Sequence, residues 1–281
     1  MVGTVRPTDA IDTVATTPDQ VKQCCAAVYA SDWVQLLLGD SFHPGGLALT
    51  ERLGTLLKLG PEDHVLDVAC GRGASAIHLA RTFGCRVTGV DYSPENVERA
   101  REAARDSGLG DQVVFLHGDA EHLDLPSAAF DALICECALC TFPDKQSAVS
   151  EFRRVLRPGG RAGVSDVTRD GPLPPELDTL LARVACIADA LPVQDYAALL
   201  EEADIGQASV EPHDMVVQEI VQRIRAGLLG AQILAGLGHL PPAMAGVDLR
   251  QAIELANLVA AAAHDGRLGY ALITACDNDA V

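Results

Sequence analysis

The chain has 281 residues, of which 48% are hydrophobic, so one large domain, or a domain with an added lobe, can bury a sizeable core. Its 21 Lys and Arg residues against 39 Asp and Glu residues give a formal net charge of −18, which disfavours phosphate backbones and anionic membrane surfaces as partners. The nine cysteines form no small-domain disulfide framework, and we see no signal-peptide core or membrane-spanning run, so we expect a cytoplasmic protein with reduced thiols.

Two helices and a loop are expected before the first strand. Residues 1–19 are polar and contain Thr and Pro, which predicts a loose arm. Apolar side chains at helical spacing predict a helix over residues 20–38. Residues 42–46 have the glycine and proline of a loop, and residues 47–59 are expected to form a helix that leads into the first strand.

The stretch from His64 to Gly73 organises the rest of the chain. It begins with an apolar run of strand type, turns at Gly71 and Gly73, and continues into a helix expected over residues 74–83. Strand, glycine turn and helix form the first unit of a nucleotide-binding α/β sheet. Because glycine has no Cβ, this turn lets the backbone come close to a ligand.

The next segments repeat the alternation of strand and helix. A second strand over residues 86–91 ends in Asp91, whose carboxylate can accept hydrogen bonds from both ribose hydroxyls of a nucleoside. Ser93 and Pro94 suit the N-cap and the first position of the helix that follows. The remaining elements of this half are strands over residues 113–116, 130–134 and 160–167 and a helix over residues 144–156.

The last third of the chain is expected to add a mainly helical lobe. We expect the last strand to run antiparallel at or near one edge of the sheet. Residues 215–263 should pack an apolar face on the sheet domain or on a second subunit. The expected elements are helices over residues 176–190, 193–203, 215–237 and 249–263, a short strand over 209–211 and a last strand over 269–276.

Four motifs together resemble the class I S-adenosylmethionine (SAM) methyltransferases. They are Asp67-Val68-Ala69-Cys70-Gly71-Arg72-Gly73, the strand-end Asp91, Gly118-Asp119-Ala120, and Leu156-Arg157-Pro158-Gly159-Gly160. The resemblance covers residues 60–166, and it departs from the family at Ala69, where glycine is often found. An NAD enzyme is the competing interpretation. Such an enzyme usually has a third glycine where Ala76 stands, but alanine is also allowed there, so this position does not decide between the two. The proline-glycine-glycine element favours SAM.

The resemblance implies a Rossmann-like α/β fold with a seven-stranded, mostly parallel sheet, helices on both faces and a helical insertion near the C-terminus. It implies a helical lid over residues 1–59, a SAM-binding core over 60–212, and a helical lobe with the last strand over 213–281. Asp91 is expected to hold the ribose and Asp119 the adenine amino group. The cofactor-binding residues that it implies are Asp67, Ala69, Gly71, Gly73, Asp91, Tyr92, Asp119, Ala120 and Cys135.

Three cysteines, Cys135, Cys137 and Cys140, lie at the end of the fourth strand. Cys135 and Cys137 point to the same face of a strand, and strand ends on this side of the sheet face the ligand crevice. Three interpretations compete. Cysteines can be buried small hydrophobic residues, which we prefer for Cys85 and Cys276. They can form a structural zinc site, for which only half of the usual paired set is present, or they can hold a thiophilic substrate.

The segment from Asp131 to Cys137 is similar to the segment of arsenite methyltransferases that ends in an arsenic-binding cysteine. The resemblance places Cys137 as one arsenic ligand and Cys186 as the second, with Cys24 or Cys25 as a third. It also implies a thiol reductant, such as glutathione or thioredoxin. Methylation of arsenic needs no general base, and we expect the sulfurs of Cys137 and Cys186 to lie within roughly 4–6 Å beside the SAM methyl group.

Two other functions stay open. The cofactor motifs equally suit methyl transfer to a small organic acceptor of quinone or natural-product type, with His43, His122 or Glu136 as the base. The third is a non-enzymatic SAM- or metalloid-binding protein, although the acidic charge and the lack of a DNA-binding motif weigh against a DNA-bound sensor. The expected partners are small molecules rather than nucleic acid or membrane, and we expect a monomer or a homodimer.

Overall fold

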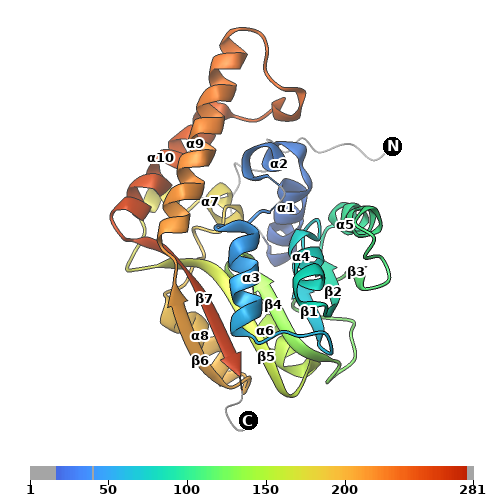
Figure 1. Ribbon diagram of the computed structural model, residues 1–281. Helices are drawn as coiled ribbons and strands as arrows, with labels where there is room; N and C mark the ends of the chain where they lie inside the picture. The colour runs from blue at the N-terminus through green and yellow to red at the C-terminus, as the bar shows by residue number, and fades with distance from the viewer. Residues whose placement is uncertain (1–16, 40, 277–281) are drawn as a thin grey trace.

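A computed structural model describes residues 17–39 and 41–276 of the chain (Figure 1). Its centre is one seven-stranded sheet in the order β3-β2-β1-β4-β5-β7-β6. β7 runs antiparallel to both of its neighbours and the other strands run parallel, which confirms the expected Rossmann-like fold. The strands are β1 (His64–Val68), β2 (Arg86–Asp91), β3 (Val113–His117), β4 (Phe130–Glu136), β5 (Leu156–Arg169), β6 (Gln207–Pro212) and β7 (Leu268–Cys276).

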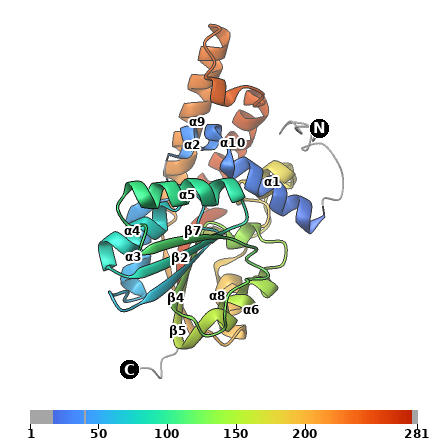
Figure 2. The ribbon, with the colours of Figure 1, turned by 90° about the vertical axis from the view of Figure 1, so that its right-hand side faces the viewer.

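Helices cover both faces of this sheet (Figure 2). The figures show α3, α4 and α5 on one face, α6 and α8 on the other, and α1 and α2 beyond the carboxyl ends of the parallel strands. The helices are α1 (Pro18–Ala30), α2 (Asp32–Leu38), α3 (Gly46–Leu56), α4 (Ala74–Phe83), α5 (Pro94–Asp106), α6 (Lys145–Val155), α7 (Leu180–Val184), α8 (Val193–Glu202), α9 (Met215–Gly236) and α10 (Leu249–His264).

The elements form where burial and capping predict them. β1 and β4 are almost entirely buried, which suits their nearly continuous apolar sequences in a sheet covered on both faces. α5 begins as expected, because Ser93 Oγ accepts a hydrogen bond from the N–H of Asn96 at 3.2 Å and Pro94 is the first helical residue. Helical crossovers between parallel strands bring the carboxyl ends of those strands to one edge of the sheet.

The segment expected as one helix over residues 20–38 forms two helices, α1 and α2. They are separated at Ser31, whose backbone is extended with a ψ of 148° and whose hydroxyl donates to the carbonyl oxygen of Val28. A hydroxyl that competes for a helical carbonyl favours such a break. Of the arm expected over residues 1–19, residues 1–16 lie outside the described residues, and α1 already begins at Pro18.

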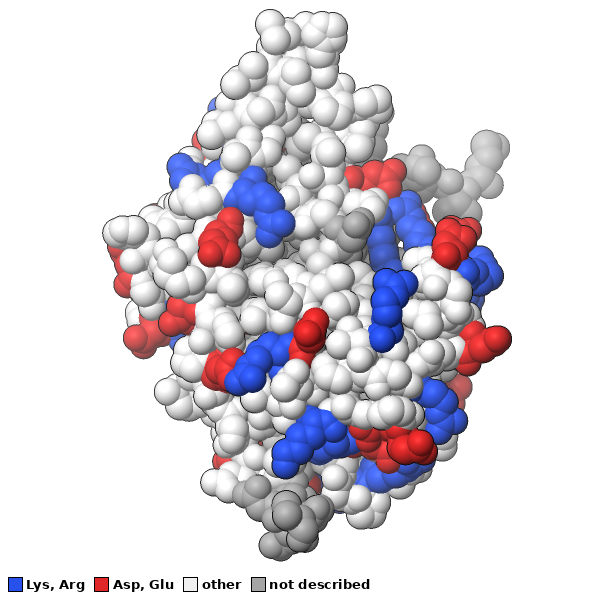
Figure 3. Space-filling model, in the orientation of Figure 1, with Lys and Arg blue, Asp and Glu red and all other residues white. Residues whose placement is uncertain are grey.

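α9 and α10 form the helical lobe expected near the C-terminus. They pack against each other and against β7, and α9 also packs against α2. A small apolar cluster joins the lobe to α2, and it consists of Leu37, Leu228, Ala231, Met244 and Ala256. On the face shown in Figure 3, charged side chains are spread over the sheet domain but are not seen at the tip of the lobe. Within the described part of the chain, no helix is long and apolar enough to cross a membrane.

The single helix expected over residues 176–190 is wrong. A 3-10 turn over Pro175–Leu177 is followed by the short α7, which starts anew because the Thr179 hydroxyl caps it by accepting a backbone N–H at 3.1 Å. The chain then turns through Cys186, whose φ of +63° is incompatible with a right-handed helix. Two local signals, a cap and a left-handed residue, therefore override the helical spacing of the apolar side chains.

The two cysteines expected to be buried differ. Cys85 is fully buried before β2, as expected. Cys276 is exposed, so that expectation is wrong. Cys276 is the last residue of β7, and this end of the strand is exposed although most of the strand is buried. The apolar sequence of the strand does not show which of its residues lies at the exposed end.

Candidate active site

A cavity opens at the carboxyl ends of β1, β2 and β4, and we name it the cofactor cavity. At this point the strand order reverses, because the chain continues from β1 to β2 on one side and later to β4 on the other. Such a reversal makes the loops on either side diverge and leaves a crevice, where open α/β sheets bind their ligands. The walls come from the turn after β1, the ends of β2 and β4, the loop after β3, and α1.

The two glycines of the turn after β1 have different roles. Gly71 lines the cofactor cavity, and its φ is +54°. Gly73 does not line the cavity; a Cβ added there would lie 2.5 Å from the Phe115 ring. Gly73 is therefore needed for close packing of α4 on the sheet, and only Gly71 allows backbone approach to a ligand. Ala69, where the family often has glycine, has a φ of +58° and also lines the cavity.

Two of the expected carboxylates are held in position beside this cavity. Asp91 Oδ2 accepts a hydrogen bond from the N–H of Gly71 at 2.8 Å, and its Oδ1 accepts one from the N–H of Ser93 at 2.9 Å. Asp119 Oδ2 forms an ion pair with Lys22 Nζ at 2.8 Å. A carboxylate has about four lone-pair sites, so both side chains can also accept hydrogen bonds from ribose hydroxyls or an amino group.

Asp67, at the end of β1, is the third carboxylate of the cofactor cavity. It is 2% exposed, and its Oδ2 has no hydrogen-bond partner. Burial, followed by the nearby charges of Glu136 and Asp91, raises the pKa of this carboxyl well above its usual range. A buried, unpaired carboxylate oxygen fits a cationic ligand group, such as the ammonium of SAM. The residues of this cavity therefore fit SAM.

The remaining expected cofactor residues divide into two groups. Tyr92 and Ala120 line the cofactor cavity together with Ala69. Cys135 is fully buried in β4 and lines no part of it, so the structure gives it no contact with the cavity. Its place in the core suits a small apolar side chain.

Two basic residues that sequence reasoning missed tie α1 and α2 to this cavity. The Arg72 guanidinium donates to the carbonyl oxygens of Ala30 at 2.9 Å and Ser31 at 3.2 Å, at the junction of the two helices. Lys22 Nζ lies 2.5 Å from Glu121 Oε2 in addition to its pair with Asp119. Arg72 stands inside the glycine motif, and Lys22 is the one lysine of α1. These contacts hold α1 against the cavity, and the role of residues 1–59 as a lid stays a prediction.

A second cavity, which we name the apolar chamber, lies beside the first and has a volume of about 180 Å³. Its walls come from α1, α2, α9, α10 and the segment around α7, and none of the described residues that line it is charged. Tyr29, Phe42 and Cys137 line both the chamber and the cofactor cavity. A group held at this shared wall can thus contact both spaces.

Cys137 and Cys186 meet at the shared wall, although one follows β4 and the other follows α7. The Cys186 sulfur lies 3.2 Å from the carbonyl oxygen of Cys137 and 3.5 Å from the Tyr29 hydroxyl. The thiols of Cys137 and Cys140 donate hydrogen bonds to the Cys186 sulfur once it is ionised, and this lowers its pKa well below the usual value. The same hydrogen bond, together with burial, raises the pKa of Cys137. Cys186 therefore contacts Cys137, while the expected spacing of the two sulfurs and their place beside the SAM methyl group stay predictions.

Both cysteines have backbones in the left-handed region, with φ of +51° at Cys137 and +63° at Cys186. Residues with a Cβ avoid this region, at a cost of about 1–2 kcal/mol each. The Cys137 N–H donates to the carbonyl oxygen of Ser165 at 2.6 Å, and the Cys186 N–H donates to that of Arg183 at 3.0 Å. Strained residues held in this way are often found at functional sites.

Of the two cysteines expected as a third ligand, Cys25 faces this cluster. It lines the cofactor cavity, and burial together with the nearby Cys186 raises the pKa of its thiol to about 12. Cys24 is half-buried and lines neither cavity. The role of these cysteines as arsenic ligands stays a prediction.

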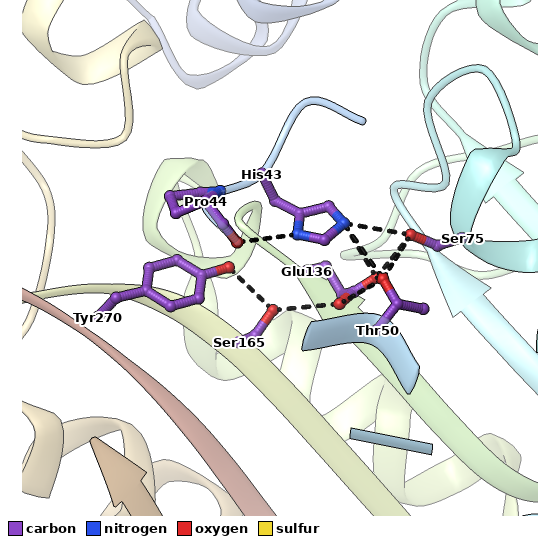
Figure 4. Close-up of polar contacts among 7 residues, drawn as sticks. All are labelled: His43, Pro44, Thr50, Ser75, Glu136, Ser165 and Tyr270. Atoms are coloured by element: carbon purple, nitrogen blue, oxygen red, sulfur yellow. Dashed lines mark hydrogen bonds and ion pairs between the residues drawn. The ribbon is translucent and has the colours of Figure 1, made fainter. Parts of the chain in front are cut away.

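Glu136 is the centre of a buried polar network beneath the cofactor cavity (Figure 4). Its carboxylate accepts hydrogen bonds from the hydroxyls of Thr50 at 2.9 Å and Ser75 at 2.6 Å. A longer contact of 3.5 Å joins it to Ser165, whose Oγ accepts a hydrogen bond from the Tyr270 hydroxyl at 3.0 Å. These donors satisfy a carboxylate that is only 4% exposed, so the network fixes its position.

His43 belongs to the same network, and both of its ring nitrogens have partners there. Nδ1 lies 3.2 Å from the carbonyl oxygen of Pro44, and Nε2 lies 3.2 Å from the Thr50 hydroxyl and 3.5 Å from Glu136 (Figure 4). His43 also lines the cofactor cavity, and which of its nitrogens carries the proton depends on the tautomer. His122, the other histidine considered as a base, is exposed and lines neither cavity.

The fold is a Rossmann-like α/β fold, and carboxylates at the cofactor cavity fit a ligand that carries hydroxyl groups and a cationic group. The chain matches a family described as "Methyltransferase domain" over residues 66–164. The 27-O-demethylrifamycin SV methyltransferase of Amycolatopsis mediterranei is 32% identical over 197 residues, which cover 64% of this chain and 72% of that relative. The chain belongs to the class I SAM-dependent methyltransferases, so it is a methyltransferase with SAM as its cofactor.

Two further proteins are similar to this chain. The arsenite methyltransferase of Halobacterium salinarum is 33% identical over 162 residues, which cover 56% of this chain and 40% of that protein. The crystal structure of the cyclase SpnF matches with a TM-score of 0.72 and 25% identity, over 94% of this chain and 97% of that chain. Small-molecule acceptors are consistent with these relatives.

Proposed function

We propose that this methyltransferase transfers the methyl group of SAM to trivalent arsenic held by Cys137 and Cys186. One observation carries the proposal: two thiols from separate elements meet at the wall shared by the cofactor cavity and the apolar chamber. Arsenic(III) is soft and prefers sulfur ligands. The similarity to the arsenite methyltransferase of Halobacterium salinarum supports the proposal.

Hydrogen bonds within the thiol cluster favour the thiolate form of Cys186. Thiolates rather than thiols bind soft centres, and Cys186 is the sulfur whose pKa is lowered by hydrogen bonds from Cys137 and Cys140. Cys186 therefore binds arsenic first, and Cys137 then loses its proton as the second bond forms. Because Cys137 lines both cavities, arsenic bound to it lies next to the cofactor cavity.

Bound SAM supplies an electrophilic methyl group on a sulfonium sulfur. The protein has to place a nucleophile in line with that group, and positioning supplies most of the rate. The nucleophile is the lone pair of arsenic, which carries no proton, so no general base is required. Of the two histidines considered as a base, His43 lines the cofactor cavity, whereas His122 lies outside both cavities.

Arsenic methylation requires a thiol reductant and reduced cysteines in the protein. Each transfer leaves arsenic formally pentavalent, so a thiol reductant such as glutathione or thioredoxin restores the trivalent state before another transfer. Cys137 and Cys186 have to stay unoxidised, which agrees with a reducing cytoplasmic location. A monomer or a homodimer is compatible with the site, since both cysteines belong to one chain.

The second candidate function is methyl transfer to a small organic acceptor. The apolar chamber favours it, because a hydrophobic acceptor would fit between α2, α9 and α10. The similarity to the rifamycin methyltransferase supports it as well. An oxygen acceptor would need a base, and Glu136 is the carboxylate at hand in the cofactor cavity.

Methylation of arsenite by the purified protein tests the proposal. The full chain is incubated with SAM, arsenite and glutathione, and methylated arsenic is measured by mass spectrometry. We expect methylated products from the parent protein and at least a 100-fold loss in C137S and in C186S, because a hydroxyl cannot compete for arsenic(III). SAM affinity, measured by calorimetry, should stay within twofold in both variants.

Two matched serine variants serve as controls. C85S changes a buried cysteine outside the site, and C276S changes an exposed one. Both should methylate arsenite like the parent. If C137S and C186S also do so, arsenic is not held by these thiols and the organic acceptor becomes the better assignment.

A further inference from the structure

The apolar chamber is larger and more hydrophobic than the binding of arsenite alone requires. Its volume is about 180 Å³, and side chains such as Trp33, Leu37, Val221 and Leu255 line it. An engineered apolar cavity of about 150 Å³ in another protein stays dry and binds benzene. Arsenite carries only hydroxyl groups, which lose hydrogen bonds to water between such walls. A chamber of this kind fits a hydrocarbon group about as large as a phenyl ring.

The two thiols are part of the wall of this chamber. Cys137 and Cys186 both line it, whereas Cys140 is buried beneath them and lines neither cavity. Arsenic(III) forms three bonds and keeps one lone pair. With two bonds to Cys137 and Cys186 and its lone pair toward the cofactor cavity, the third bond extends toward the chamber.

We propose that the preferred acceptor is a trivalent organoarsenical whose single carbon substituent is an aromatic or similarly large apolar group seated in the chamber. The inference rests on the proposed function and names the substrate class of the same site. It accounts together for the thiols and for the apolar walls of the chamber, which separately favour different acceptors.

The reaction balances without a further reactant. The two thiols replace two hydroxyl groups of R–As(OH)₂ and release two waters. The arsenic lone pair forms the As–CH₃ bond while the methyl–sulfur bond breaks, and that electron pair stays on sulfur, so the positive charge passes to arsenic. Two waters then displace the thiolates, which gives R(CH₃)As(O)OH, two cysteine thiols and one proton. Arsenic is oxidised from the trivalent to the pentavalent state, and the methyl group is transferred as a cation.

Binding can be measured independently of turnover, because the single tryptophan of the chain, Trp33, lines the chamber. Phenylarsonous acid and arsenite are the two probes, each titrated into the full-length protein. We expect phenylarsonous acid to change Trp33 fluorescence with at least tenfold higher affinity than arsenite. The same change should be absent in C186S.

Turnover is compared with the same two probes in the presence of SAM and glutathione. We expect kcat/KM for phenylarsonous acid to exceed that for arsenite at least tenfold, or about 1.4 kcal/mol. A256F places a ring inside the chamber from α10, and the ratio of the two kcat/KM values should fall to near one. A252F fills the chamber from the same helix and serves if A256F does not fold. A261F, on the exposed face of α10, should keep the parent ratio.

The outcomes separate this inference from the proposed function. If arsenite is methylated at least as well as phenylarsonous acid, or if A256F and A252F both keep the parent ratio, the organoarsenical assignment is overturned while the proposed function stands. If the folded, SAM-binding protein methylates neither probe, the proposed function fails and this inference fails with it. A preference for the phenyl compound that is lost on filling the chamber supports the assignment.

Discussion

The cofactor cavity and the apolar chamber are built in opposite ways. The cofactor cavity is lined by several carboxylates, among them Asp67, Asp91 and Asp119, as well as by apolar side chains. Most of its lining residues come from successive turns after β1, β2 and β3, within one continuous part of the sequence. The chamber is apolar, and its walls come from helices at both ends of the chain, from α1 to α10. The cavity that fits the cofactor is thus formed mainly by local motifs, whereas the apolar chamber depends on packing between distant segments.

Among the variants that test this contrast, the largest effect is expected from D91A, because Asp91 belongs to the locally built cofactor cavity. D91A removes an acceptor for both ribose hydroxyls, and hydrogen bonds to a charged group contribute roughly 1.5–3 kcal/mol each. We expect SAM affinity in calorimetry to fall at least tenfold. D111A, at an exposed site before β3, is the matched control and should bind SAM like the parent. Unchanged affinity in D91A would show that the ribose is held elsewhere.

A smaller effect, on stability, is expected from Asp166 beneath the thiol cluster. Burial, followed by the nearby Cys186, raises the pKa of this carboxyl to about 7. Between about pH 4 and pH 7 the folded protein therefore holds a proton that the unfolded chain has released, so stability falls as pH rises. We expect this part of the slope, about 1 kcal/mol per pH unit, to be absent in D166N.

Urea unfolding at pH 5, 6 and 7 measures this difference. Asp67 and Asp91 also have raised pKa values and give slopes of the same sign, but they are present in both proteins and cancel in the comparison. Parallel curves for the parent and D166N would mean that Asp166 is ionised throughout this range. The electrostatic effect of Cys186 and of burial on the pKa of Asp166 would then be weaker than the geometry indicates.

The smallest effect is expected at Ala69, in the turn of the cofactor cavity. Its φ of +58° costs an alanine about 1 kcal/mol. Glycine avoids this penalty, although it raises the entropy of the unfolded chain and so offsets part of the gain. A69G should raise the free energy of unfolding by about 0.5–1 kcal/mol without weakening SAM binding. A261G, in a right-handed helix, should change stability by a similar amount in the opposite direction. Destabilisation by A69G would show that its methyl group contributes packing.

The contrast also explains what could be predicted from the sequence. Asp91 and Gly71 could be placed at the cavity from the sequence, because Asp91 ends β2 and Gly71 lies in the turn after β1. Gly73 was predicted for the right turn but for the wrong reason, since packing against Phe115 rather than a ligand requires it. Such a distinction depends on a partner from another strand, which a local motif does not contain.

The thiol cluster was predictable only through a resemblance. No spacing rule connects Cys137 with Cys186, and the helix expected over residues 176–190 would have placed Cys186 differently. The left-handed backbone at Cys186 breaks that helix and turns the side chain toward Cys137. The chamber, and the ties of Arg72 and Lys22 to the N-terminal helices, depend on tertiary contacts that have no sequence period.

The placement of β7 between β5 and β6 has a consequence for protein synthesis. β6 pairs only with β7, so it leaves the ribosome before its partner exists, and the edge of β5 stays open meanwhile. Residues 213–267 take several seconds to translate at about 5–20 residues per second. Unpaired strand edges are prone to association with other chains. The nascent chain should therefore depend on chaperones during this interval, and ribosome-stalled chains that end before β7 should aggregate or be degraded.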